Sequence, residues 1–117
     1  MIQTLIKKDP PKDTELSLHL KRILSLIPDD RTITAREIAS ITGCTTVDVR
    51  QSISRLVTSY HKPIGTFNSE FTGKGFKMIT TQDEQLYTIK NLRSRAEHIL
   101  SRAKAIESMK IDKGRDA

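Results

Sequence analysis

Residues 33–78 constrain the fold of this chain more than any other stretch. Two segments in it, residues 34–41 and 45–60, carry apolar side chains three and four positions apart, which is the spacing of one helix face. Each segment opens with the spacing of a capping box, in which a hydroxyl and an acidic side chain satisfy backbone groups reciprocally: Thr34 with Glu37, and Thr45 with Asp48. The sequence therefore predicts two short helices in succession.

A tight turn, Thr42-Gly43-Cys44, joins these two helices, because glycine is the usual residue where a helix ends in a left-handed conformation. In the first of the two helices, Ile38 and Ile41 are expected to face the core. In the second, one face carries Val49, Ile53, Leu56 and Val57. A third helix precedes the pair over residues 14–27, with Thr14 as its N-cap, and its apolar face consists of Leu16, Leu20, Ile23, Leu24 and Ile27.

A β-hairpin follows the helices over residues 63–79, with strands at 64–67 and 76–79. Gly73-Lys74-Gly75 lies in the predicted loop, and glycines permit backbone angles that other residues resist, so Lys74 is expected at a tight tip. Thr32-Ile33 can add a strand of one residue pair before the second helix. The predicted fold class is α+β, mostly helical.

The two ends of the chain flank this region. Residues 1–13 contain Pro10-Pro11 and are expected to form a flexible arm, because proline disfavours helix. A long helix, capped by Thr81, is predicted over residues 82–109, with a frayed tail beyond it. The expected organisation is an arm (1–13), one domain (14–80), a C-terminal helix (81–110) and a tail (111–117).

Composition narrows the class of protein. The 117 residues are 36% hydrophobic and 29% charged, which suits one small domain with a modest core. No apolar run approaches the roughly 18 residues of a membrane helix, and no signal peptide is visible. A single cysteine, Cys44, fits the reducing cytoplasm. The net charge of +6 favours encounters with polyanions.

Enzyme chemistry has little support in the sequence. His19, His61 and His98 are scattered without the spacing of metal ligands, and there is no cysteine cluster. Gly73-Lys74-Gly75 lacks the strand-loop-helix setting of a phosphate-binding loop. Cys44 is better explained as a small core residue than as a nucleophile. We therefore expect a binding protein with no metal and no cofactor, and not an enzyme.

The order of these motifs resembles the winged helix-turn-helix of the biotin-repressor type. The residues that carry the resemblance are Thr34-Ala35-Arg36-Glu37-Ile38-Ala39, Thr42-Gly43, Val49 to Leu56, Lys62-Pro63-Ile64 and Gly73-Lys74-Gly75-Phe76. Phe76 replaces the tyrosine that is usual in the family, and the loop at Asn68 to Thr72 is longer than in the shortest versions. No ligase domain follows, so no biotin chemistry is implied. The overall layout is also similar to small winged-helix proteins encoded by phages and prophages.

The resemblance implies binding of double-stranded DNA, with the helix of residues 45–60 in the major groove and the hairpin, or wing, on the backbone. The base-reading residues would be Thr46, Arg50 and Gln51, which are types that pair with base edges. The residues expected to hold the DNA backbone are Thr45, Ser54, Arg55, Lys62, Asn68, Ser69 and Lys74, with a further contribution from Lys77.

The C-terminal helix carries a second pattern, which we call the seam: Ile89, Leu92, Ala96, Ile99, Ala103 and Ile106. Their alternating intervals of three and four make a heptad repeat, broadened by Leu86 and Leu100. Such a seam packs against another helix. It either pairs with its copy in a homodimer, which we favour, or folds back onto the first helix. The charged residues off the seam, such as Lys90 and Arg93, are expected to form a solvated face.

The main functional hypothesis is a dimeric, cytoplasmic winged-helix protein that regulates transcription or phage replication. The alternative is a protein-interaction module that captures a host replication or regulatory protein. Asp48, close to the expected base-reading residues, favours this alternative, as does the modest net charge.

Overall fold

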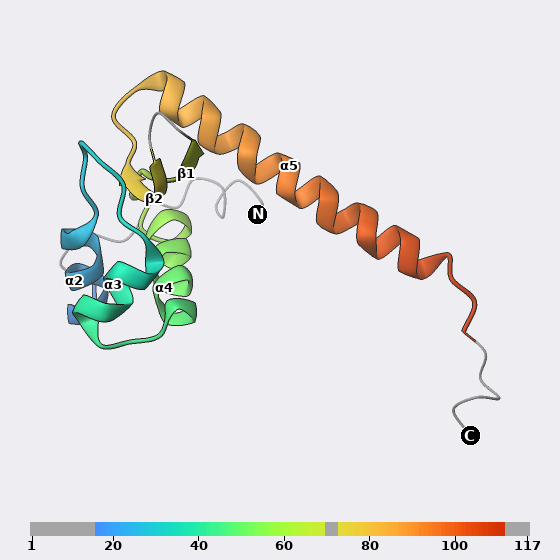
Figure 1. The fold of residues 1–117 in the computed structure, drawn as a ribbon, viewed down its shortest axis with the longest axis horizontal. Coiled ribbons are helices and arrows are strands. Elements are labelled where there is room, and N and C mark those ends of the chain that lie inside the picture. The colour runs from blue at the N-terminus through green and yellow to red at the C-terminus, as the bar shows by residue number, and fades with distance from the viewer. Residues whose placement is uncertain (1–15, 70–72, 112–117) are drawn as a thin grey trace, which may run out of the picture.

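The structure is a computed structural model, and it describes residues 16–69 and 73–111, to which all structural statements here refer. The described part is mostly helical, with one antiparallel hairpin, and so confirms the α+β class (Figure 1). In chain order the elements are α2 (Leu18–Leu26), α3 (Ala35–Thr42), α4 (Thr46–Thr58), β1 (Ile64–Ser69), β2 (Gly73–Met78) and α5 (Gln82–Glu107).

A hydroxyl side chain begins each of the four helices among the described residues by accepting a hydrogen bond from a backbone N–H of the first turn, which satisfies a donor that the helix leaves unpaired. These caps are Ser17, Thr34, Thr45 and Thr81. The predicted cap Thr14 lies outside the described residues, and α2 begins later than expected, because Ser17 Oγ already accepts from Leu20 N. The predicted arm, residues 1–13, also lies outside the described residues, as do residues 112–117 of the tail.

The core lies between α2, α3 and α4, which pack on one another in pairs. Its fully buried side chains are Ile23, Ile38, Val49 and Leu56, so the predicted apolar faces of all three helices are confirmed. Ile41 is an exception, since 51% of it is exposed. The prediction that Ile41 faces the core is wrong because α3 is short and ends at Thr42, where Gly43 turns the chain with φ of 76°.

The hairpin is longer than predicted and its loop is shorter. Ile64 pairs with Met78 at one end, and Ser69 pairs with Gly73 at the other. The prediction that Gly73-Lys74-Gly75 forms the tip is therefore wrong, since all three residues belong to β2. Instead, glycine is needed in β2 where its backbone comes close to the residues before α3. A Cβ on Gly75, where φ is 126°, would collide with the backbone carbonyl of Ile33.

That close approach is a backbone bridge between the helical core and the hairpin. Ile33 N donates to Phe76 O at 2.9 Å, and Phe76 N donates to Ile33 O at 2.7 Å, which confirms the predicted one-pair strand before α3. At the other side of the hairpin, Lys62 N donates to Leu56 O at 2.9 Å, after His61 has turned the chain with a positive φ of 55°. These contacts fix the hairpin relative to α4.

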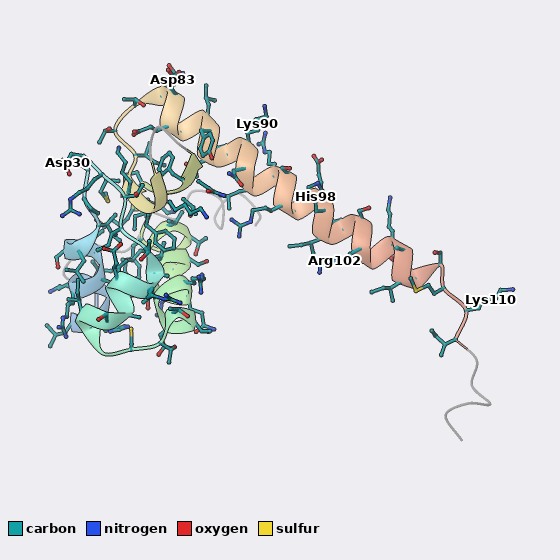
Figure 2. The ribbon with its side chains drawn as sticks, viewed as in Figure 1. Asp30, Asp83, Lys90, His98, Arg102 and Lys110 are labelled. Atoms are coloured by element: carbon teal, nitrogen blue, oxygen red, sulfur yellow. The ribbon has the colours of Figure 1, made fainter. Side chains whose placement is uncertain are left out.

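The C-terminal helix α5 leaves the rest of the molecule (Figure 1). It packs against β1, and every residue from Leu92 to Ile111 is exposed, as Figure 2 shows for His98, Arg102 and Lys110. The radius of gyration is 18.3 Å, against about 13 Å for a compact domain of this size. The alternative in which this helix folds back onto the first helix is therefore not the arrangement found. Among the described residues, no helix is both long and apolar enough to cross a membrane.

Candidate nucleic-acid interface

Helix α4 presents two rows of mainly polar side chains to solvent. Because Val49, Ile53 and Leu56 point into the core, residues four apart on the other side form adjacent ridges. One row runs through Thr46, Arg50 and Ser54, and the other runs through Val47, Gln51 and Arg55. Arg50, Gln51, Ser54 and Arg55 are all exposed, whereas Thr46 is half-buried. Except for Thr46, the α4 residues predicted as contacts thus share an open face.

The start of α4 is held in place by its neighbours. Asp48 N donates to Thr45 Oγ1 at 3.1 Å, so Thr45 serves as the N-cap, and this forms one half of the predicted capping box. In the last turn of α3, Arg22 of α2 donates to Ile41 O at 2.9 Å. Thr42 Oγ1 lies 3.0 Å from Cys44 Sγ, and Cys44 packs against the core. The turn that leads into α4 is therefore tied to both preceding helices.

A pocket of about 510 Å³ lies between the start of α2 and the second row of α4. Its walls are mainly polar: Ser17, His19, Leu20, Asp48, Gln51, Ser52, Arg55 and Tyr60. The basic Arg55 and the acidic Asp48 therefore line the same hollow. Sequence reasoning missed the α2 side of this surface, because Ser17 and His19 lie more than 30 positions before Arg55 and only the packing of α2 on α4 brings them together.

The hairpin contributes a smaller polar surface. Lys74 in β2 is exposed and pairs across the sheet with Asn68 of β1, which is also exposed. Ser69 pairs with Gly73 at the last described residue pair before the loop. Lys62 is half-buried between α4 and β1. The predicted backbone contacts of the hairpin therefore lie along its strands, with Lys74 one pair back from the end.

Lys77 does not belong to this surface. Its side chain is buried, its Nζ lies 2.8 Å from Glu84 Oε2, and it also donates to Met78 O at 3.0 Å. The hydrogen bond from Lys77, together with one from Thr80 N, lowers the pKa of Glu84 to about 2. The expectation that Lys77 contributes to a phosphate contact is wrong, because its buried ammonium group forms an ion pair with Glu84 that joins β2 to α5.

The first turns of α5 carry the rest of that junction. The rings of Phe67 in β1 and Tyr87 in α5 are stacked, with centroids 5.5 Å apart and planes 6° apart. Thr88 is buried beneath Gly65, where a Cβ would come within 2.7 Å of Thr88 Oγ1, so only glycine permits this approach. The polar contacts of Glu84, the Phe67–Tyr87 stack and the close packing of Gly65 on Thr88 therefore join α5 to the hairpin, and none of them uses the seam.

One exposed apolar residue on α4 escaped the sequence reasoning. Val47 is 58% exposed and stands beside Gln51, on the ridge opposite to the core. The exposure of Val47 could have been predicted from the sequence, because Val47 falls outside the spacing of Val49, Ile53 and Leu56. Elsewhere, the described residues contain no group of three or more His, Cys, Asp or Glu side chains placed to hold a metal ion.

Comparisons with known proteins found no relative of this chain. No protein-family model matches the chain, and neither the curated proteins nor the solved structures contain a significant match.

Proposed function

We propose that residues 16–78 form a winged helix-turn-helix and that the chain binds double-stranded DNA as a homodimer, in the regulation of transcription or of phage replication. The observation that carries this proposal is the exposed face of α4, with Arg50, Gln51, Ser54 and Arg55, on a helix that contacts a hairpin bearing the exposed Lys74. Hydrogen-bond donors on a helix match the acceptors on base edges in a DNA groove. Donors on a neighbouring hairpin match the phosphates beside that groove.

In this proposal, the position of a residue along α4 decides its task. Arg50 and Gln51, at the start of α4, are the base-reading candidates, since arginine pairs with guanine and glutamine with adenine. Thr46 is half-buried, which leaves it a smaller part. Val47 adds an apolar surface that suits a thymine methyl group. Ser54 and Arg55 lie one turn further along α4, and the proposal assigns them to contacts with the DNA backbone.

The remaining contacts in the proposal go to phosphates and carry no sequence information. Lys74 and Asn68 on the hairpin, together with Thr45 at the helix start, fit this task because all three are exposed. Lys62 and Ser69 complete the set, although Lys62 is only half-exposed. The pairing of the two copies is assigned to the seam of α5.

The test is binding of a random pool of short duplexes, measured by fluorescence anisotropy as the salt concentration rises. We expect binding at low ionic strength whose log affinity falls linearly with log salt, because each phosphate contact releases counterions. Selection from the same pool would then yield a motif, and a palindromic motif would report a two-fold dimer. The double variant Arg50→Ala/Arg55→Ala is the control, with its fold checked by circular dichroism. Absence of salt-dependent binding by the parent chain would rule the proposal out.

A second candidate is a winged-helix module that binds a host protein. Ile41 and Val47 favour it, because both are exposed apolar residues beside the turn, and Asp48 is an acid on the same face. Isolation of one host protein in stoichiometric amount, from a chain that shifts no DNA, would select this function over the first.

A further inference from the structure

Helix α5 has one face that contacts its own domain and another that is exposed. Glu84, Tyr87, Thr88 and Asn91 are the α5 residues with half-buried or buried side chains, and they follow the spacing i, i+3, i+4, i+7 of one stripe. The seam lies on another stripe. Leu92, Ile99 and Ile106 are 50%, 58% and 62% exposed. The helix therefore joins its own domain through one face and leaves its apolar face uncovered.

We propose that the seam binds the seam of a second copy in a parallel, in-register pair. This inference rests on the homodimer in the proposed function and specifies its geometry. In heptad notation Ile89, Ala96 and Ala103 occupy the a positions, while Leu92, Ile99 and Ile106 occupy the d positions. The apolar contact extends over about 25 Å of helix at 1.5 Å per residue. The two alanine layers let the helices approach closely.

Charge decides the direction of the pair. Arg102 is at a g position and Glu107 is at the next e position, five residues later. In a parallel pair each g residue faces the following e residue of the other helix, so two Arg102–Glu107 ion pairs form across the interface. Within one helix, residues five apart do not face each other, so Arg102 and Glu107 can form this ion pair only between two copies.

An antiparallel pair has the opposite electrostatics. To bring all six seam residues into contact it must place Ile89 opposite Ile106 of the other copy. The g positions of the two helices then face each other, and Arg102 meets Arg95 of the second copy twice by symmetry. Like charges at such positions repel, so the sequence disfavours this direction.

Disulfide trapping distinguishes the two directions. Cys44 is the single cysteine, so Cys44→Ser gives a background without thiols, into which Ile89→Cys and Ile106→Cys are introduced separately. In the parallel pair, each variant forms a disulfide with its own copy, and a mixture gives only these two products. In the antiparallel pair, neither variant links to itself, since two copies of position 106 lie about 25 Å apart at 1.5 Å per residue. The mixed product alone would then appear and would overturn the proposal.

A charge exchange provides a second readout, with the dimer dissociation constant measured by analytical ultracentrifugation. Arg102→Glu and Glu107→Arg should each weaken the parallel dimer about two- to thirty-fold, and the double variant should restore it. In the antiparallel pair Arg102→Glu would instead tighten the dimer, because the new carboxylate would face Arg95. Tightening by this variant, or a parent chain of monomer mass at micromolar concentration, would refute the parallel pair.

The same samples separate this inference from DNA binding. A monomeric chain that still binds duplexes would refute the pairing and leave DNA binding in place. A trapped parallel dimer that fails to bind any duplex would confirm the pairing and refute the DNA-binding function.

Discussion

The ammonium group of Lys77 in β2 lies 2.8 Å from Glu84 Oε2 in the first turn of α5, and both side chains are largely withdrawn from solvent, at 8% and 18% exposure. Glu84 Oε1 also accepts from Thr80 N at 2.8 Å. One carboxylate thus joins the last strand, the connecting turn and the long helix. In its charged form this group is one of the contacts that fix α5 on the hairpin.

Stability should therefore fall in acid through Glu84. Its pKa is about 2 in the folded chain against an ordinary value of 4.5, because Lys77 and Thr80 N donate to its charged form. The contribution is complete above pH 4.5 and is lost as the pH falls through about 2. Glu84→Gln should cost about 1–3 kcal/mol at neutral pH and remove this part of the acid dependence. Urea denaturation from pH 7 to pH 2 measures both. Asp83→Asn, at the neighbouring exposed acid, is the control and should keep the acid dependence.

Gly75 should be less replaceable than Gly43, although both have positive φ. Gly75→Ala should cost about 1–3 kcal/mol from its backbone conformation alone, and more from the collision with the Ile33 carbonyl. Gly43→Ala has open space around the added methyl group and should cost about 1–2 kcal/mol. Denaturation midpoints of the two variants check the difference. Equal losses would contradict the close contact between β2 and the strand before α3.

Thr88 should tolerate loss of its hydroxyl group. Its Oγ1 is buried and has no hydrogen-bond partner among the described residues. Thr88→Val keeps the shape and removes the desolvated oxygen, so we expect a gain of about 1 kcal/mol in the free energy of unfolding. Thr88→Ser keeps the oxygen and loses a methyl group, and should be less stable than the parent. A loss of stability in Thr88→Val would show that the hydroxyl has a partner, such as an ordered water.

Replacement of Arg50 or Gln51 should relax the DNA sequence preference. A bidentate contact to a base discriminates by about 1–3 kcal/mol, so Arg50→Ala and Gln51→Ala should each lose preference at one or two base pairs. Competition between selected and mutated duplexes measures the loss. Arg36→Ala, an exposed arginine on α3, removes the same charge and should leave the preference unchanged. A uniform loss across all duplexes would move Arg50 to the backbone contacts.

Replacement of Lys74 should weaken binding equally for all sequences. Lys74→Gln removes one proposed phosphate contact, so the slope of log affinity against log salt should decrease in magnitude by about one. Lys21→Gln makes the same charge change on α2 and should leave the slope nearly unaltered. If the two variants behave alike, the hairpin does not touch DNA.

The sequence predicted local structure well, because local rules set helices and their caps. Capping spacing placed the starts of α3 and α4, and the three-and-four pattern identified Ile38, Val49 and Leu56 as core residues. It misassigned Gly73-Lys74-Gly75, because a glycine required by a close strand 40 residues away has the same local signature as a glycine in a turn. It misjudged Lys77 for a similar reason, since the partner Glu84 lies across a junction that no local pattern describes.

By itself, then, the sequence determined the order of the elements, the core faces of α2 and α4 and the existence of a heptad seam, which are all consequences of periodicity along the chain. The tertiary structure decided which surfaces stay open. It brought Gln51 and Arg55 to the same pocket as the start of α2, withdrew Lys77 from solvent and turned the α5 seam away from its own domain. The physical reason is that burial depends on packing between segments distant in sequence, whereas helix and turn formation depends on neighbours.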